Sequence, residues 1–440
     1  MFVIQAYSYR LLIKNIISSK LQSSECMIKR RLSLHEYHSF RLLEEAGVPV
    51  PPFVVASNKV DAGEKVRKLK TDNLVIKAQV LTGARSKGFF KGGLKGGIKM
   101  VNSADEAEKI AGQMIGDYLV TQQTGAKGLL CNYVMIAKRL KIIKEFYLGI
   151  IMERNFGGPV ILSSVHGGAD IDHLSKTTPE AINYTPVDII KGLERREAEE
   201  IAEKIDLGDK KKEAGEIVMK LYEIFIKRDA LLIDINPLGL DHQGNLWCID
   251  AKLKFDDDAA YKQRTLHSLR DTSQEDPRVI QAAKHKFSYV PMDGNIGCLV
   301  SGAGLAMATI DIINLHGGSP ANFVNVSSLR GSKERLKAGL KLIMSEPSVM
   351  VVFINIFDGR CEVIAEGIVL AIQELNIDVP IVCRLQGRNA KDARILLGMA
   401  NLKILPVPDL EEASRLVVKV AQIMVLAKSK NVKVNFELPI

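Results

Sequence analysis

The sequence predicts an α/β protein with at least two domains, the second built on a doubly wound parallel sheet. At 440 residues the chain is too long for one hydrophobic core. After residue 290, short apolar runs alternate with helical stretches, which is typical of a parallel sheet covered by helices. Before residue 270, β-rich runs joined by glycine turns indicate hairpins.

The composition is that of an ordinary globular protein, with 47% hydrophobic and 25% charged residues. No apolar run approaches the length of a membrane span, and no basic stripe indicates nucleic-acid binding. The six cysteines form no CxxC pair, and no His/Cys cluster has zinc spacing. We therefore expect reduced thiols, and neither a membrane nor a nucleic acid as partner.

The first 31 residues differ from the rest of the chain. They contain six Lys or Arg residues against a single acid, Glu25, and are rich in serine. This pattern predicts a mitochondrial transit peptide over residues 1–31. A basic arm for nucleic acid is the alternative, but the segment is apolar as well as basic.

The first part of the chain opens with a helix signal and continues to a cationic strand. Ser33 and Glu36 have the spacing of a capping box, which predicts a helix that starts near Ser33 and ends at Gly47. Residues 73–80 form a β-rich run that contains Lys77, a cation that is costly to bury without an anion. The glycine-rich segment 81–98 that follows carries Arg85 and suits a polyphosphate.

Two further hairpins are expected in this part. Residues 146–153 and 160–164 resemble paired strands, and residues 186–230 are mostly helical. The runs 230–238 and 245–252 form the second hairpin, in which Asn236 and Asp250 could face each other. Oxygen ligands of this kind suit Mg²⁺ bound beside phosphates.

A polar linker over residues 271–289 precedes the predicted parallel sheet. Its expected strands are 296–300, 321–326, 350–356, 379–385 and 402–405. Ligands of such sheets lie at the carboxyl ends of the strands, where this sequence has the segments 301–304, 327–328, 357–360 and 386–387. The small-residue turn at 301–304 opens a helix, whose N-terminus suits an anion. An ordinary tight turn would have the same sequence pattern.

Longer motifs carry a family resemblance. They include residues 32–37 (LSLHEY), 75–80 (VIKAQV), 235–237 (INP) with 250–252 (DAK), 273–277 (SQEDP), 293–298 (DGNIGC) and 302–309 (GAGLAMAT). In this order they resemble the β subunits of succinyl-CoA ligase. The C-terminal stretch from residues 426–428 to 436–440 resembles the ADP-forming mitochondrial type rather than the GDP-forming one. The resemblance implies an ATP-grasp domain over residues 32–270 and a flavodoxin-like CoA-ligase domain over residues 290–440.

The resemblance also implies a reaction and a partner. ATP, succinate and CoA would yield ADP, phosphate and succinyl-CoA, a step of the citric acid cycle in the mitochondrial matrix. The chain would act in a heterodimer with an α subunit that binds CoA and carries a phosphorylated histidine. Mg²⁺ would accompany the nucleotide.

The family's functional positions carry over to this sequence one by one. The nucleotide would be held by Lys77, Ala84, Arg85, Ser86, Asn132 and Lys138. Mg²⁺ would be held by Asn236 and Asp250, and Asp234 would be the catalytic carboxylate that approaches the phosphohistidine. The substrate would contact Ser301, Gly302 and Gly359.

The departures from the family pattern concentrate in these loops. The loop 83–87 reads Gly-Ala-Arg-Ser-Lys where the family has Gly-Gly-Arg-Gly-Lys. The family places a glutamate near the base and ribose, and the nearest positions here are Ala137 and Lys138. Asp234 and Ser301 replace Glu and Asn. The loop 355–361 is two residues shorter than in the family and carries a new anion, Asp358, next to Gly359 and Arg360. Three hypotheses follow: a working ligase, an impaired paralogue that serves in assembly, or a ligase for another dicarboxylate such as malate.

Overall fold

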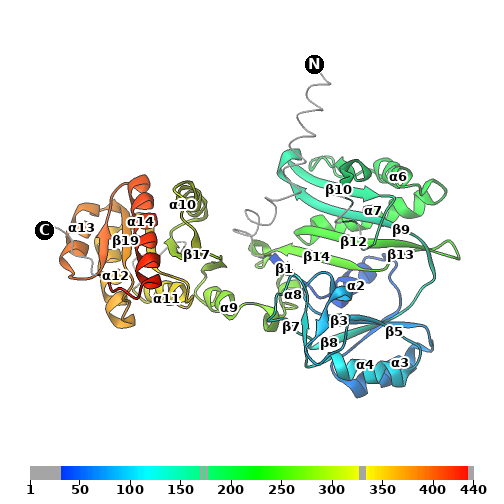
Figure 1. Cartoon of the computed structure of the whole chain (residues 1–440). Helices are drawn as coiled ribbons and strands as arrows, with labels where there is room; N and C mark the ends of the chain where they lie inside the picture. Colours follow the sequence, from blue (N-terminus) through cyan, green and yellow to red (C-terminus); the bar gives the residue numbers. More distant parts are fainter. Residues whose placement is uncertain (1–30, 169–170, 172–173, 175–176, 327–332, 435–440) are drawn as a thin grey trace. The chain divides into compact units, whose positions relative to one another are not determined.

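The computed structural model describes residues 31–434 apart from 169–170, 172–173, 175–176 and 327–332. The chain divides into two compact units, residues 1–274 and 275–440 (Figure 1). The predicted transit peptide, except for Arg31, lies outside the described residues, as do Ser327 and Ser328. No helix in the described part of the chain is long and apolar enough to cross a membrane.

A seven-stranded antiparallel sheet forms the larger core of the first unit. Its order is β1-β14-β12-β9-β10-β11, with β13 paired to β12. The strand bounds are β1 Arg31–Ser33, β9 Ile142–Glu153, β10 Gly158–Ser164, β11 Asn183–Pro186, β12 Ala230–Asp241, β13 Leu246–Cys248 and β14 Ala251–Asp256. The sheet packs against α2 (Glu36–Glu45), α6 (Arg195–Lys204) and α7 (Lys211–Lys227). The hairpin of 146–153 with 160–164 and the helical content of 186–230 are therefore confirmed.

Two smaller sheets complete this unit. One has the order β2-β8-β3-β5, and the other has the order β4-β6-β7. The helices α3 and α4 lie side by side against the four-stranded sheet (Figure 1). The bounds are β2 Phe53–Ala56, α3 Lys59–Leu69, β3 Leu74–Gln79, β4 Phe89–Phe90, β5 Ile98–Val101, α4 Ala104–Met114, β6 Tyr118–Val120, β7 Leu129–Leu130 and β8 Tyr133–Lys138.

The predicted capping box at Ser33 is wrong. Ser33 ends strand β1 and pairs with Lys254 of β14, so the chain is still extended there. Helix α2 begins three residues later, after His35, which makes no side-chain cap. Glu36 turns into the interior instead of back toward Ser33, because a buried ammonium group, that of Lys77, is there to meet it.

The predicted single strand over 245–252 is two strands. The segment β13 pairs with residues 238–240 of β12, whereas β14 pairs with residues 230–235 of the same strand. The chain leaves the regular ladder at Ile249 and Asp250, between the two segments. This interruption gives Asp250 a place beside Asn236, whose backbone N–H donates to the carbonyl of Asp250 at 3.2 Å.

The second unit is a six-stranded sheet of order β15-β17-β16-β18-β19-β20. The strands from β16 onward are parallel and β15 is an antiparallel edge. Counted from β16, the parallel order is 2-1-3-4-5, the flavodoxin-like arrangement, so the predicted doubly wound sheet is confirmed. The strand bounds are β15 Ser288–Pro291, β16 Ile296–Val300, β17 Pro320–Asn325, β18 Val351–Arg360, β19 Ile381–Arg388 and β20 Ile404–Pro406.

Helices cover this sheet in two groups. The helices α10 and α14 pack against each other, and α11, α12 and α13 pack in succession. The bounds are α10 Ala303–Leu315, α11 Lys333–Met344, α12 Cys361–Leu375, α13 Ala390–Met399 and α14 Leu410–Ser429. The segment that the sequence presents as a linker, 271–289, contains a short 3₁₀ turn (Thr272–Gln274), helix α9 (Pro277–Lys284) and the first residues of β15.

Candidate functional site

Two buried cations form the centre of the site in the first unit. Lys77 on β3 is 6% exposed, and its Nζ donates to Oε1 of Glu36 at 2.6 Å and to the carbonyl of Ile249 at 2.9 Å. An ammonium group has three N–H bonds, so these contacts use two of them. The anion that a buried lysine requires is therefore Glu36, 41 residues away in the chain.

Arg85 is the second cation. It is 7% exposed, and its Nη1 donates to the carbonyl of Ala78 at 3.1 Å. Its Nη2 lies 2.7 Å from Oε2 of Glu36 and 3.1 Å from Oδ2 of Asp250. Burial opposes the charge on the guanidinium, but the two carboxylates outweigh it and raise the pKa of Arg85.

The backbone of the loop around Arg85 is strained at Ala84, one of the two positions where the family pattern has glycine. Ala84 has a φ of 54°, in the left-handed region that favours glycine. Ser86 lies in a 3₁₀ turn over Arg85–Lys87 and is not among the residues with positive φ. Both side chains are exposed. A hollow of about 420 Å³ lies beside this turn, and Ser86, Lys87, Lys95 and Lys99 are among its lining residues.

Asn236 and Asp250 are next to each other, but their side chains have different surroundings. Oδ1 of Asn236 accepts from the N–H of Gly168 at 2.6 Å, and its Nδ2 donates to the carbonyl of Gly168 at 3.1 Å. Oδ1 of Asp250 is buried and has no hydrogen-bond partner among the described residues. Burial favours the neutral acid, but Lys77 and Arg85 outweigh it and lower the pKa of Asp250.

These oxygens fit a divalent cation chemically. An ionised carboxylate oxygen without a donor and an amide oxygen are hard ligands of the kind Mg²⁺ takes. No group of three or more His, Cys, Asp or Glu side chains surrounds a common point in the part of the chain that the structure describes. The remaining ligands of such a cation would be waters and phosphate oxygens, as is usual for Mg²⁺ at a nucleotide.

Asp234 lies two residues before Asn236 on β12 and faces Lys252 on β14. The Nζ of Lys252 is 3.4 Å from Oδ2 of Asp234, and Tyr147 also contributes a hydrogen bond. Burial raises the pKa of Asp234, while the ammonium of Lys252 opposes the rise.

Asn132 and Lys138 lie outside this centre of buried charge. Asn132 donates from Nδ2 to Oγ of Ser273 at 2.8 Å, and that hydroxyl donates to Oδ1 of Asp271 at 2.6 Å. Asp271 also bonds to Nε2 of His35 at 2.8 Å, so a chain of hydrogen bonds links Asn132 to the residue that precedes Glu36. Lys138 is exposed at the end of β8.

In the second unit, Ser301, Gly302 and Gly359 lie at the carboxyl ends of β16 and β18. These two strands flank the point where the strand order reverses, which is the ligand site of doubly wound sheets. Oγ of Ser301 accepts from the N–H of Phe357 at 2.9 Å and lies 3.2 Å from its carbonyl. Gly302 and Gly359 have φ values of 94° and 106°, which glycine adopts without strain.

Behind these strand ends lies a buried polar group that the sequence did not reveal. Asn355 of β18 is fully buried, and its Oδ1 accepts from Nη1 of Arg384 at 2.9 Å. Its Nδ2 donates to Oγ1 of Thr309 at 2.8 Å, in helix α10. This amide therefore ties the helix after Ser301 to the neighbouring strand β19.

Glu36 is the other functional candidate that the sequence pattern concealed. Its spacing from Ser33 predicted a helix cap, and only its burial shows that it belongs to the cation centre. Lys77 in an apolar strand was the available signal, since it required an anion, but nothing local identifies which acid supplies it.

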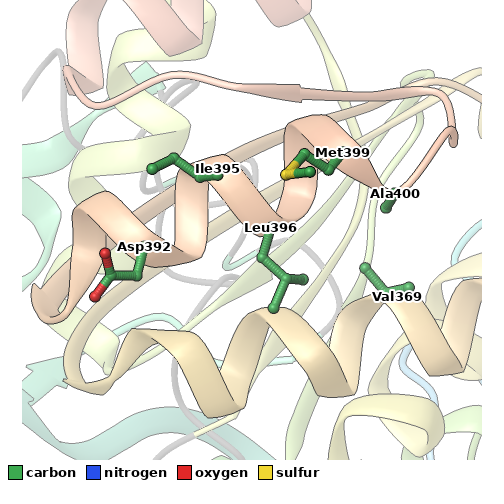
Figure 2. Close-up of a pocket in the computed structure, with 6 residues that line it drawn as sticks. All are labelled: Val369, Asp392, Ile395, Leu396, Met399 and Ala400. Carbon is green, nitrogen blue, oxygen red and sulfur yellow. The ribbon is translucent and has the colours of Figure 1, made fainter.

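A shallow apolar hollow of about 450 Å³ lies between α12 and α13 (Figure 2). It contains none of the site residues expected from the sequence. Its lining residues are Val369, Asp392, Ile395, Leu396, Met399 and Ala400.

Comparison with known proteins identifies relatives along most of the chain. The ATP-grasp domain model matches residues 33–240, and the CoA-ligase model matches residues 299–418. The mitochondrial succinate–CoA ligase [ADP-forming] subunit beta of Columba livia is 47% identical over 414 residues, 93% of this chain and 100% of that protein. The mitochondrial [GDP-forming] subunit beta of Mus musculus is 40% identical over 407 residues, 92% and 94% of the two chains.

A solved structure has the same fold along most of the chain. ATP citrate lyase from Methanothrix soehngenii, in complex with citrate and coenzyme A, aligns with a TM-score of 0.63. The alignment covers 89% of this chain and 100% of that chain at 20% identity, which shows a shared fold alone.

Proposed function

Since the chain belongs to the family of succinate–CoA ligase β subunits, we propose that it forms ADP, phosphate and succinyl-CoA from ATP, succinate and CoA. We place this activity in a heterodimer with an α subunit, in the mitochondrial matrix. The reaction would run through a phosphorylated histidine of that α subunit.

One observation carries the nucleotide part of the proposal: Lys77 and Arg85 are buried together beside Asp250. Buried cations interact with phosphate more strongly than solvated ones, because little water screens them. Lys77 retains one N–H bond for a phosphate oxygen beyond the two already described. Arg85 can offer a second Nη1–H and its Nε–H in the same region.

We propose that Asp250 and Asn236 hold the Mg²⁺ that accompanies the nucleotide. The unpartnered Oδ1 of Asp250 supports this assignment. The amide oxygen of Asn236 accepts one hydrogen bond, from the N–H of Gly168, and retains a second lone pair for the cation. Bound Mg²⁺ neutralises charge on the transferred phosphoryl group.

Asp234 is the proposed catalytic carboxylate. It lies within strand β12, and its carboxylate is hydrogen-bonded to Lys252 and Tyr147. From there it can orient the histidine of the α subunit by accepting a hydrogen bond from its ring, which stabilises the charge formed during transfer.

We propose that succinate and its activated acyl form bind in the second unit. Ser301, Gly302 and Gly359 surround the switch point of the sheet, at the N-terminus of the 13-residue helix α10. The N-terminal turn of α10 and its helix dipole favour an anion there, whether the carboxylate of succinate or a phosphoryl group.

The choice between ATP and GTP rests on family resemblance, because relatives of both nucleotide types match the chain. The ADP-forming type is favoured by the relative at 47% identity. Asn132 and Lys138 are the proposed contacts with the base and ribose, and Ala84, Arg85 and Ser86 line the phosphates.

A working enzyme is favoured over an impaired paralogue because Lys77, Arg85 and Asp250 are present and already assembled. The test is to co-purify the chain with a mitochondrial α subunit and supply ATP or GTP. Phosphohistidine labelling of the α subunit and succinyl-CoA formation are both expected, with ATP preferred. A stable complex that shows neither with either nucleotide would contradict the proposal and leave an assembly subunit. Labelling with turnover only on malate would contradict the choice of succinate.

A further inference from the structure

Glu36 divides its two carboxylate oxygens between the two cations of the nucleotide site. Oε1 lies 2.6 Å from Nζ of Lys77, and Oε2 lies 2.7 Å from Nη2 of Arg85. The glutamate is 5% exposed, and both cations are almost as deeply buried. A carboxylate in this position fixes the positions of both cations, because buried cations have little access to water that could solvate their charge.

The backbone that carries Glu36 is itself fixed to the strand that carries Lys77. The N–H of Tyr37, the next residue, donates to Oε1 of Gln79 at 3.2 Å. Gln79 is fully buried on β3, two residues beyond Lys77. This hydrogen bond ties the first turn of α2 to strand β3, next to the residue that bears the carboxylate.

Arg85 is shared between two acids. Its Nη2 is closer to Glu36, at 2.7 Å, than to Asp250, at 3.1 Å. Two cations, Lys77 and Arg85, and two carboxylates, Glu36 and Asp250, make this centre electrically balanced. Without Glu36, the only carboxylate left to Arg85 in this set would be Asp250, the acid whose Oδ1 is free of hydrogen bonds among the described residues.

We propose that Glu36 is a positioning residue that holds Arg85 away from full pairing with Asp250 and thereby keeps Asp250 available to the divalent cation of the nucleotide. The proposal rests on the proposed function, because it assumes that Asp250 meets a metal. Glu36 itself touches neither the metal nor the phosphates in this account. It acts through Arg85.

The arrangement of charges predicts that Glu36→Gln weakens metal binding. The neutral amide no longer attracts Arg85, so the guanidinium shifts to Asp250 and competes with the metal for it. Loss of a residue that orients a metal ligand typically weakens metal binding by roughly 10- to 100-fold. Glu36→Asp keeps the charge at shorter reach, and we expect it to retain much of the metal affinity.

A second substitution distinguishes this competition from a general loss of structure. In Glu36→Gln with Arg85→Met, the competing cation is gone and Lys77 still balances Asp250. We expect metal affinity to recover in the double variant relative to Glu36→Gln alone, although Arg85→Met removes a phosphate contact. A purely structural role for Glu36 predicts the opposite, since the double variant loses more interactions than the single one.

The experiment measures Mn²⁺ binding by electron paramagnetic resonance on the complex of the full chain with the α subunit, with saturating ADP. Glu44→Gln is the matched control, because Glu44 is exposed on the same helix and undergoes the same charge change. The expected result is a dissociation constant for Mn²⁺ raised by roughly 10-fold or more in Glu36→Gln. Glu36→Asp and the double variant should bind Mn²⁺ more tightly than Glu36→Gln but more weakly than the wild type. Glu44→Gln should bind Mn²⁺ with wild-type affinity.

Wild-type Mn²⁺ affinity in Glu36→Gln would overturn the proposal. So would a double variant no better than Glu36→Gln, which would mean that Arg85 is not the competitor. If Glu36→Gln does not fold on its own, a double variant that binds Mn²⁺ more weakly than Arg85→Met alone would overturn the proposal, because Glu36 would then act on the metal without Arg85. Failure of the wild-type complex to bind Mn²⁺ with ADP would instead contradict the proposed function.

Discussion

Asp234 and Lys252 face each other across strands β12 and β14, with Nζ of the lysine 3.4 Å from Oδ2 of the aspartate. Burial raises the pKa of Asp234, and the ammonium of Lys252 counteracts the rise. The lysine thus favours the ionised carboxylate that the proposed phosphoryl transfer requires.

Asp234→Asn tests this carboxylate, because it keeps the shape of the side chain and removes its charge. We expect phosphorylation of the α-subunit histidine to slow by roughly 100-fold, the scale of one positioned acid–base group. The measurement is single-turnover labelling with ATP. Asp234→Glu, which introduces the family's longer acid, serves as the control and should keep or increase the rate. Equal rates in Asp234→Asn and the wild type would remove Asp234 from the mechanism.

Ala84→Gly should stabilise the first unit. Ala84 has a φ of 54°, where a β-carbon is unfavourable and glycine is not. Relief of this conformation is expected to add about 1 kcal/mol to the free energy of unfolding, measured by urea titration. Ser86→Gly is the matched control, because Ser86 is not among the positive-φ residues and glycine there only adds unfolded-state entropy. A gain in both variants, or in neither, would contradict the assignment of strain to Ala84.

The carboxylate of Asp241 accepts hydrogen bonds across the turn between β12 and β13. We therefore expect the stability of the folded protein to depend on pH. Although burial opposes its charge, hydrogen bonds from Asn245, Trp247 and the N–H of Gln243 lower the pKa of Asp241 to about 2. A depressed carboxyl pKa stabilises the folded state above the unfolded pKa of about 3.9. That contribution disappears as the pH falls through about 2.

Asp241→Asn should therefore unfold at a lower temperature than the wild type at pH 7, because Trp247 Nε1 and Asn245 Nδ2 both donate to Oδ2. The difference in melting temperature should shrink as the pH is lowered toward 2. Asp105→Asn is the control, since the side chain of Asp105 is 90% exposed. A melting difference for Asp241→Asn that is constant between pH 7 and pH 3 would show that its charge is not what stabilises the turn.

Ser301→Ala separates the acid site from the nucleotide site. The hydroxyl of Ser301 holds the backbone of Phe357, two residues before Gly359, so its loss frees the loop at the end of β18. We expect the KM for succinate to rise by roughly 10-fold, the loss of about one hydrogen-bonded contact to a charged group. The KM for ATP and the labelling of the α-subunit histidine should not change.

Ser345→Ala is a suitable comparison, because Ser345 also bonds to backbone but at the end of helix α11. A rise in the KM for ATP in Ser301→Ala, with no change for succinate, would place the substrate acid elsewhere.

Local sequence patterns were sufficient to predict most of the helices and strands. The parallel strands 296–300 and 350–356 were predicted from apolar runs, and residues 296–300 and 351–356 are buried in strands β16 and β18. The predicted start of α2 was wrong. The capping box is also a local pattern, but Ser33 pairs with strand β14 instead, and this long-range pairing keeps the chain extended there. The loss of two glycines near Arg85 had a visible consequence at Ala84 and not at Ser86, since only one of the two positions needs a positive φ.

The fold class, the family membership and the types of side chain available to the site can all be recognised in the amino-acid sequence. Periodicity, turn residues and motifs act over a few neighbouring residues, so they can be recognised along the chain. Which charged side chains lie next to each other depends on the three-dimensional packing. Glu36 and Lys77 are 41 residues apart, and Arg85 and Asp250 are 165 apart. A buried charge needs a partner, but the partner is selected by the packing of α2, β3 and the end of β13, and no local pattern contains that information.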